Sequence, residues 1–351
     1  MITKYYQVDP LYPNIITLKK GADAIKEGKV VAFPTETVYG LGADAFNVNA
    51  LEKIYEIKGR PLDNPMILHI SSAENLHQLA RHVPDKAAKA IKAFWPGPLT
   101  VVLPKKLEVP DIVSAGLPTV AIRMPLHAVA LKLIKLAKVP IAAPSANLSG
   151  RPSPTTGLHV LRDLKGRVEM IIDGGPCLWG IESTVVDFTS EVPLILRPGA
   201  VTIEMLEAVV GQVKYDCALH DSLQAPVSPG LKYVHYAPKG KMYMVAGENS
   251  EKITKKIQEL IEQYQRKNKR VAALVSREIL KEIKQLKPDY LADMGSVSEM
   301  ELVASRIYPL LRNCDKMNIE IIITHAFPEE GLGAAVMNRL IKASGNRIVK
   351  A

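Results

Sequence analysis

The sequence predicts an α/β protein in two parts, an N-terminal mixed sheet followed by a smaller doubly wound domain. Three observations support this prediction. The 351 residues suit two domains better than one. Short β-branched runs alternate with helical patterns over the first 200 residues, and the alternation resumes after residue 240. Apolar residues make up 47% of the chain, which is enough to form a core in each part.

In the first part, the order of the expected strands and helices predicts a sheet covered by layers of helices. Strands are expected at Val30–Phe33, Met66–Ile70, Leu99–Leu103, Val120–Ile122, Ile141–Ala143, Met170–Ile172, Thr184–Asp187 and Leu194–Leu196. Helices are expected at Ile16–Lys26, Asn49–Ile57, Ala73–Leu79, Asp85–Phe94 and Leu126–Lys135. Some neighbouring strands have no helix between them, which predicts a mixed rather than a parallel sheet.

A helix at Val201–Val210, with Thr202 as its N-cap, is expected to close this part. Residues 211–240 then lose periodicity and read as a linker, although KYVHYAP at 232–238 is unusually aromatic and basic for a spacer. We therefore expect a first domain at 14–200, a helix and linker at 201–239, and a second domain at 240–351.

The second domain shows a regular alternation of strand and helix patterns. Strands are expected at Met242–Val245, Val271–Val275 and Ile319–Ile323, and helices at Ser250–Lys267, Ser276–Gln285, Ser298–Leu311 and Gly333–Ala343.

Composition narrows the class of protein only partly. The net charge of +9 is compatible with anionic ligands such as nucleotides or RNA. Three widely spaced cysteines have no zinc spacing and suggest free thiols in a reducing cytoplasm. The sequence contains neither a signal-peptide pattern nor an apolar run long enough to span a membrane, so we expect a cytoplasmic protein.

The first informative segment is PTETVYGLG at 34–42. Two glycines, Gly40 and Gly42, let the backbone approach a ligand, and two threonines and a carboxylate supply polar groups. The segment matches neither a dinucleotide fingerprint nor a Walker loop. An ordinary strand-to-helix turn remains the alternative.

The second segment, 58–69, holds Lys58 and Arg60 on either side of Gly59 before Pro61 ends a helix. A point charge and a guanidinium fork held this rigidly suit a polyphosphate. The alternative is that both cations only offset the helix dipole.

Three further regions carry polar groups in or next to predicted strands. Arg123 lies inside a strand and needs an anion, which is either a ligand or a structural ion-pair partner. Segment 142–150 offers hydroxyl and amide groups for phosphate or carboxylate, or simply a capped turn. Segments 173–185 and 196–199 add glycine turns, a Ser-Thr pair and Arg197.

No covalent nucleophile with a paired base is recognisable, and GxSxG, HExxH and EF-hand patterns are absent from the sequence. Cations, hydroxyls and glycine turns without a nucleophile suit chemistry that depends on positioning and charge stabilisation. Phosphoryl and nucleotidyl transfer are of this kind.

Read in order, these segments resemble the YrdC-like family. The resemblance rests on PTETVYGLG at 34–42, KGRP at 58–61, DNP at 63–65 with His69, WPGPLT at 95–100, VAIRMP at 120–125, APSAN at 143–147, SPT at 153–155, DGG at 173–175, ESTVVD at 182–187 and LRPG at 196–199. The linker and the second α/β domain look like the two-domain form, the L-threonylcarbamoyladenylate synthases.

The resemblance implies a twisted mixed sheet with a deep basic cavity and a C-terminal Rossmann-like domain. It also implies that residues 14–200 are the catalytic domain and that the helix and linker at 201–239 cover the active site. It implies a nucleotidyltransferase that forms threonylcarbamoyl-AMP and pyrophosphate from ATP, L-threonine and bicarbonate, for N6-threonylcarbamoyl modification of tRNA. Mg2+ is expected to arrive with ATP, without a dedicated protein site.

Site residues carried over by position fall into two groups. The L-threonine group comprises Thr37, His69, Arg123, Ala143 and Ser183. The ATP group comprises Lys58, Arg60, Asn64, Thr119, Ser145, Ser153, Arg197 and His235, with Tyr236 as the alternative to His235 in the linker. Lys58 and Arg60 are the expected catalytic residues.

We expect a monomer that supplies the tRNA threonylcarbamoyl transferase machinery and contacts no membrane. A protein that binds double-stranded RNA or tRNA without synthase activity is the competing hypothesis. It explains the net charge, but it explains less well why basic residues stand singly beside glycine and proline.

Overall fold

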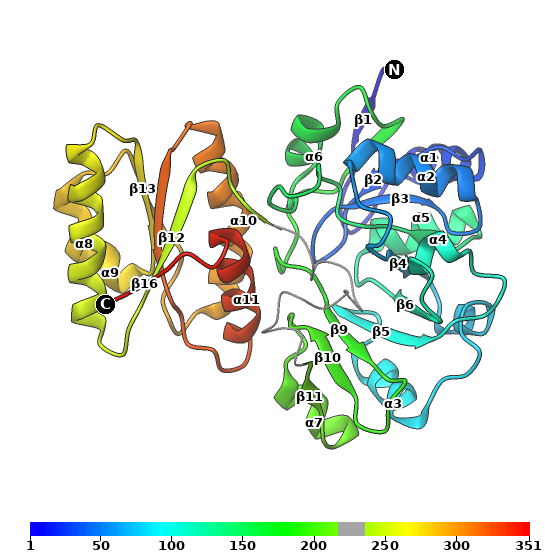
Figure 1. Ribbon diagram of the computed structural model, residues 1–351. Helices are drawn as coiled ribbons and strands as arrows, with labels where there is room; N and C mark the ends of the chain where they lie inside the picture. The colour runs from blue at the N-terminus through cyan, green and yellow to red at the C-terminus, as the bar shows by residue number, and fades with distance from the viewer. Residues whose placement is uncertain (217–235) are drawn as a thin grey trace. The chain divides into compact units, whose positions relative to one another are not determined.

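The computed structural model describes residues 1–216 and 236–351, which form two compact units (Figure 1). The first unit comprises residues 1–149 and 153–216. The second comprises residues 236–351 together with Gly150–Pro152, a short segment that belongs to it by its contacts. Ala237 N–H, for example, donates to Gly150 O (2.9 Å).

The first unit is built on a large mixed sheet. Among the described residues its order is β1-β8-β2-β3-β7-β4-β6-β5-β9-β10-β11. The strands are β1 (Lys4–Gln7), β2 (Val31–Phe33), β3 (Gly40–Asp44), β4 (Ile67–His69), β5 (Leu99–Pro104), β6 (Thr119–Arg123), β7 (Ile141–Ala142), β8 (Met170–Asp173), β9 (Thr184–Asp187), β10 (Leu194–Arg197) and β11 (Lys214–Tyr215). The sheet contains both parallel pairs such as β4–β6 and antiparallel pairs such as β5–β6, which confirms the predicted mixed sheet.

Helices cover this sheet. They are α1 (Ile15–Lys26), α2 (Val48–Lys58), the 3-10 helix η1 (Ala73–Gln78), α3 (Asp85–Phe94), α4 (Asp111–Ser114), α5 (Ala128–Ala137), α6 (Gly157–Leu164) and α7 (Ile203–Val210). Most of them begin at a side-chain cap, α3 and α4 being the exceptions. Thr202 caps α7 as predicted, with its side chain accepting from Met205 N–H. His127 caps α5, so this helix begins two residues after the predicted Leu126.

Residues 34–42, for which a strand-to-helix turn was the alternative, instead belong to a β-hairpin. β2 and β3 pair antiparallel, with Phe33 opposite Gly40 and Val31 opposite Gly42, so the turn reading is wrong. A Cβ on Gly42 would lie 2.6 Å from Phe33 Cε1 and 2.7 Å from Ile141 Cγ2. Glycine is therefore required here by close packing, and the glycine-rich composition hid this strand from pattern analysis.

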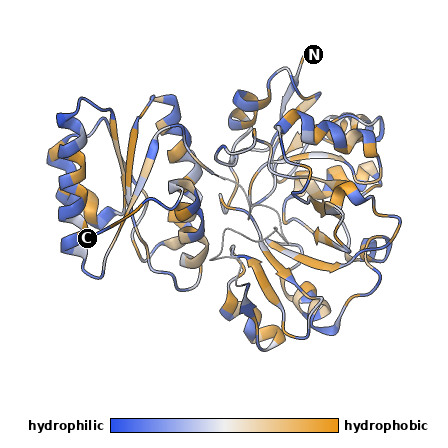
Figure 2. Ribbon diagram, viewed as in Figure 1, coloured by the Kyte–Doolittle hydropathy of each residue, from blue (hydrophilic) through white to orange (hydrophobic). Residues whose placement is uncertain are grey.

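Two apolar clusters lie on the two faces of the sheet. Successive β2 residues point to opposite faces, so Val31 and Phe33 join one cluster while Ala32 joins the other. The first of these clusters also contains Leu18 of α1 and Leu133 of α5, two helices that lie side by side in Figure 1. Figure 2 shows the apolar strands of this unit between helices with mixed surfaces.

The second unit is a parallel sheet in the order β14-β13-β15-β12-β16. Its strands are β12 (Lys241–Ala246), β13 (Val271–Val275), β14 (Tyr290–Asp293), β15 (Ile321–His325) and β16 (Ile348–Lys350). Its helices are α8 (Ser250–Arg266), α9 (Arg277–Ile283) with the 3-10 turn η3 (Lys284–Leu286), α10 (Met300–Lys316) and α11 (Gly333–Ser344). The smaller Rossmann-like α/β domain is thereby confirmed, although β14 and β16 were not expected from their short, half-exposed sequences.

Helix α8 shows how this second sheet is covered. Ile253, Ile257, Leu260 and Ile261 recur at helical spacing and are buried against the sheet. The opposite face of α8 is hydrophilic in Figure 2. Across residues 1–216 and 236–351, no helix combines the length and the apolar character needed to cross a membrane.

Candidate active site

Strand register brings three predicted or neighbouring site residues into one row. Arg123 ends β6, and it lies opposite His69 at the end of β4 and opposite Thr100 in β5. Partners in register on adjacent strands project to the same face of a sheet. The row therefore places a guanidinium, an imidazole and a hydroxyl next to one another.

The Arg123 guanidinium is buried, with 3% of the residue exposed, and each of its nitrogens faces an oxygen. Nη1 donates to Thr37 Oγ1 (2.8 Å) and Nε donates to Gly97 O (3.2 Å). Nη2 lies 2.6 Å from Glu36 Oε1. A buried arginine in a strand thus has the anionic partner that it requires. It also contacts the hydroxyl of Thr37, one of the residues predicted to bind L-threonine.

Ser183 connects the two predicted groups of site residues. Its Oγ lies 2.7 Å from Thr100 Oγ1, and it accepts from Arg197 Nη2 (3.1 Å). Arg197 Nε also donates to Ser183 O (3.0 Å). Arg197, expected with ATP, and Ser183, expected with threonine, are therefore direct neighbours.

Lys58 is held inside the unit by backbone oxygens. It is the last residue of α2, where Gly59 adopts the left-handed conformation (φ 59°) and ends the helix. Its Nζ donates to Ser145 O (2.5 Å) and to Asn147 O (2.6 Å), and only 3% of the residue is exposed. The buried position argues against a solvated charge that merely offsets the helix dipole.

The loop that holds Lys58 is joined to the β2–β3 hairpin. Leu41 N–H donates to Pro144 O (2.8 Å) and Ala146 N–H donates to Tyr39 O (2.8 Å). Gly40 and Ser145 form an isolated β-bridge. The hairpin, the 143–149 loop and the end of α2 are consequently one connected structure, which brings Ser145 to Lys58.

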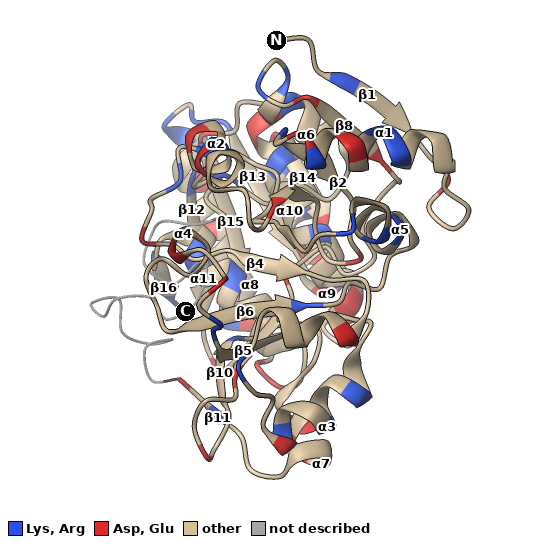
Figure 3. Cartoon of the chain, turned by 90° about the vertical axis from the view of Figure 1, so that its right-hand side faces the viewer, with Lys and Arg blue, Asp and Glu red and all other residues tan. Residues whose placement is uncertain are grey.

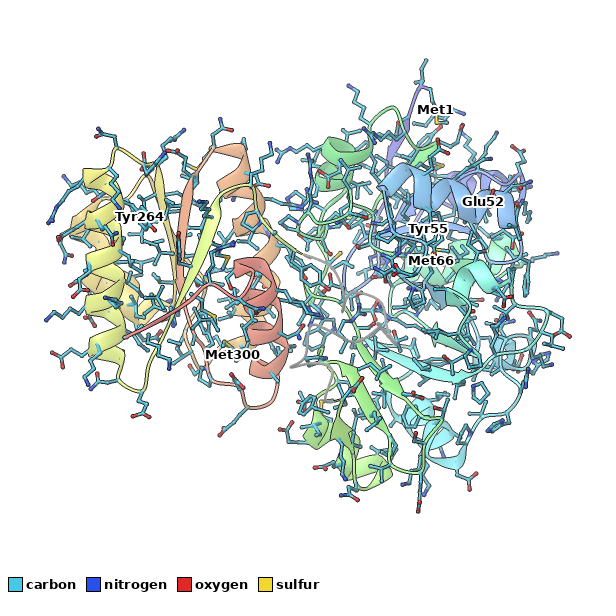
Figure 4. The ribbon with its side chains drawn as sticks, in the orientation of Figure 1. Met1, Glu52, Tyr55, Met66, Tyr264 and Met300 are labelled. Atoms are coloured by element: carbon cyan, nitrogen blue, oxygen red, sulfur yellow. The ribbon has the colours of Figure 1, made fainter. Side chains whose placement is uncertain are left out.

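Arg60 closes the next loop rather than reaching across the unit. Nε donates to Asn64 O (3.1 Å), and Nη2 donates to Asn64 Oδ1 (2.7 Å) and to Pro65 O (2.8 Å). Tyr55 Oη also donates to Asn64 O (3.2 Å). Tyr55 and Met66, both labelled in Figure 4, flank this loop on either side in the chain and are both buried.

The remaining predicted residues lie at different distances from Arg123, Ser183 and Lys58. Ala143 N–H donates to Ile67 O (3.0 Å), which fixes it beside β4. Ser153 Oγ donates to Glu182 Oε1 (2.6 Å), next to Ser183. Thr119 begins β6, four residues and roughly 13 Å along the strand from Arg123. His235 lies outside the described residues.

Two residues of the site were not expected from the sequence, Glu36 and Thr100. Both stand inside the motifs that carry the family resemblance, so their positions were visible, but their partners are distant in the chain. The requirement of a strand arginine for an anion was the signal that could have identified Glu36.

His69 is a neutral imidazole because of its surroundings. Complete burial, followed by the positive charge of Arg123, lowers the pKa of His69 to about 3. Its Nδ1 lies 3.2 Å from Ile67 O. A neutral ring beside a guanidinium can donate or accept a hydrogen bond without repelling the cation.

Replacing His69 with asparagine should reduce the loss of stability in acid. Between the unfolded pKa near 6.5 and the folded value of about 3, only the unfolded chain gains the proton, so stability falls as the pH falls. From pH 7 to pH 5 this loss is about 2 kcal/mol. The variant's free energy of unfolding should therefore fall by about 2 kcal/mol less over that interval. Urea unfolding followed by tryptophan fluorescence measures it, because Trp95 and Trp179 both lie in the first unit.

The exposed His82 provides the control for this measurement. His82→Asn should keep the wild-type loss. Equal losses in wild type and His69→Asn would show that His69 is not held neutral.

The described residues include neither a cluster of metal ligands nor an exposed cysteine. No group of three or more His, Cys, Asp or Glu side chains there could hold a metal ion. Cys177 and Cys314 are unpaired and buried. Burial raises the pKa of the Cys177 thiol, so it is protonated at neutral pH.

Basic residues stand beside acidic ones on two helices of the first unit. Figure 3 shows both basic and acidic residues on α2 and on α3. The buried cations, Lys58, Arg123 and Arg197, are instead directed at internal oxygens. This distribution favours a small anionic ligand over RNA as the partner of these cations.

Comparison with known proteins finds relatives that cover almost the whole chain. Residues 23–199 match the family described as telomere recombination, which covers Sua5, YciO and YrdC, and residues 201–345 match the threonylcarbamoyl-AMP synthase C-terminal domain. A threonylcarbamoyl-AMP synthase of Bacillus subtilis is 46% identical over 346 residues, 97% of each chain. One of Pyrococcus abyssi is 47% identical over 334 residues, 95% of each chain. The crystal structure of P. abyssi Sua5 complexed with L-threonine matches with a TM-score of 0.94 and 45% identity, covering 99% of this chain and 100% of that one.

Proposed function

Because the chain belongs to the two-domain threonylcarbamoyl-AMP synthases of the Sua5/YciO/YrdC family, we propose that it joins ATP, L-threonine and bicarbonate through the site around Arg123 and Lys58. The activity is that of a nucleotidyltransferase that serves tRNA modification. The observation that carries the assignment of the site is the buried guanidinium of Arg123 beside Thr37, in the same unit as the buried ammonium of Lys58.

Threonine is proposed to bind where the strand ends meet. Arg123 offers a fork for the carboxylate, and Thr37, His69 and Ser183 offer hydroxyl and imidazole groups. The similar P. abyssi protein was crystallised in complex with L-threonine, which supports this substrate. The backbone at Ala143 is proposed to complete this pocket.

ATP is proposed to bind along the loops that follow. Lys58 and Arg60 stand at the end of α2, and Asn64, Ser145 and Ser153 lie on loops next to them or to Ser183. Arg197 contacts Ser183, so it would stand where the two substrates meet. Thr119 and His235 stay predictions. Mg2+ is proposed to enter with the ATP phosphates, as it commonly does.

The proposed reaction has two steps. The threonine amine attacks the carbon of bicarbonate, water leaves, and a carbamate forms. A carbamate oxygen then attacks the α-phosphorus of ATP, the bond to the β-phosphate oxygen breaks, and pyrophosphate leaves. Lys58, Arg60 and Arg197 would stabilise the charge that develops on the phosphates.

Pyrophosphate release tests this proposal directly. We expect release from ATP to require both L-threonine and bicarbonate, and serine or valine to support it far less. Release in the absence of threonine would contradict the proposed substrates. Salt-sensitive RNA binding without threonine-dependent release would favour the RNA-binding hypothesis instead.

Partners beyond the substrates are proposals of the same kind. An acyl-adenylate reacts with water, so we propose that the tRNA threonylcarbamoyl transferase machinery uses it soon after it forms. A monomer in the cytoplasm, where ATP and tRNA occur, is the proposed state of the chain.

A further inference from the structure

One buried carboxylate in the site, that of Glu36, has no role in the proposed reaction. Glu36 is 3% exposed, and its backbone is fixed because Trp179 N–H donates to Glu36 O (2.8 Å). Oε1 lies 2.6 Å from Arg123 Nη2. The angles of this contact are nevertheless unsuitable for a hydrogen bond, and within the described part of the chain neither carboxylate oxygen has a hydrogen-bond partner.

The charge of Glu36 is therefore balanced, but its acceptor capacity is unused. A buried carboxylate without hydrogen bonds is costly, because it has given up its bonds to water. Such a group is expected where a ligand supplies the missing donors. Thr37, which accepts from the same guanidinium, is adjacent in the chain and places Glu36 beside the proposed threonine carboxylate.

We propose that Glu36 binds the α-ammonium group of L-threonine while Arg123 binds its α-carboxylate. This inference rests on the proposed function. An α-amino acid carries its ammonium on the carbon next to its carboxylate, so a neighbouring carboxylate and guanidinium match the two charges in reverse. Glu36 then makes the pocket selective for amino acids over hydroxy acids of the same shape.

A competing role for Glu36 is that of a counterion that only holds Arg123 in place. The two roles differ in what removal of the charge does. A counterion acts on every ligand that uses Arg123, whereas an ammonium acceptor acts only on ligands that carry an ammonium group.

The experiment compares L-threonine with (R)-3-hydroxybutanoate, which keeps the carboxylate and hydroxyl of threonine but lacks its ammonium. Dissociation constants are measured for the full chain by calorimetry, with the weaker ligand measured by competition. In Glu36→Gln we expect threonine binding to weaken about 10- to 100-fold, since a charge-assisted hydrogen bond is lost. Binding of (R)-3-hydroxybutanoate should stay the same or become tighter.

Two further variants keep the test decisive. Glu36→Asp keeps the charge balance with Arg123 but withdraws the carboxylate, so it should weaken threonine alone even if Glu36→Gln folds poorly. Asp173→Asn is the matched control, because Asp173 is a second buried carboxylate whose Oδ1 already accepts from Tyr39 Oη (2.7 Å) and Gly175 N–H (2.9 Å). It should keep the wild-type ratio of the two affinities.

Unchanged threonine binding in both Glu36 variants, or equal weakening of both ligands, would overturn the inference and leave the proposed function standing. Failure of the wild-type chain to bind threonine at all would overturn both. The two failures are thus distinguishable in one set of titrations.

Discussion

Replacing Lys58 with methionine should slow threonine-dependent pyrophosphate release by about 1000-fold. Removing one preorganised cation or donor from a charge-stabilising site commonly costs 100- to 1000-fold in rate. Methionine keeps most of the apolar bulk of the lysine stem, so this buried position should remain filled. The effect should appear in kcat and in the KM for ATP, with little change in threonine affinity.

Steady-state pyrophosphate release at saturating threonine and bicarbonate measures this change. Lys53→Met is the matched control, because Lys53 lies on the same helix but is exposed, with Nζ donating to Gly28 O (3.0 Å). It should retain nearly the full rate. A Lys58→Met rate within threefold of wild type would show that Lys58 is structural, and would return the helix-dipole alternative to consideration.

Replacing Arg123 with lysine should lower kcat/KM for L-threonine by about 100-fold. Lysine keeps the positive charge beside Glu36 but loses the planar fork, which faces Thr37, Gly97 and Glu36 at once. The loss of a bidentate, charge-assisted pair costs about 3 kcal/mol, which corresponds to about 100-fold. The KM for ATP should change much less.

Initial rates over a range of threonine concentrations at fixed ATP test this prediction. Arg162→Lys, a substitution on the surface of α6, is the control and should behave as wild type. A structural ion pair was the alternative role for Arg123. If that role is the whole explanation, Arg123→Lys will lower the free energy of unfolding while kcat/KM for threonine stays unchanged.

Strong local patterns predicted much of the fold. Helix α3 and strand β9 have the predicted bounds, because one has a marked apolar face and the other is a β-branched run. Strand β3 was missed because GLGAD lacks β-branched residues. The segment predicted as a helix at Ala73–Leu79 is the 3-10 helix η1, Ala73–Gln78. Short 3-10 segments of this kind commonly serve as connectors.

The motifs taken together, in their order along the chain, predicted more of the candidate site than the chemical argument from any single motif. Arg123 and Ser183 could be assigned to one site because each stands at a strand end inside a motif, and both lie next to Thr100. The pairing of Glu36 with Arg123 could not be predicted, because it depends on which strands are neighbours over a separation of 87 positions. The contact between Arg197 and Ser183 has the same origin.

The oxygens that hold Lys58 belong to the main chain at Ser145 and Asn147. Alanine scanning leaves both carbonyls intact, so it will underestimate how strongly this loop supports the cation. The sensitive perturbations are those that alter the path of the loop. We expect one inserted residue between positions 145 and 147 to be more harmful than replacement of either side chain, and amide-to-ester substitution to be the chemical probe suited to these carbonyls.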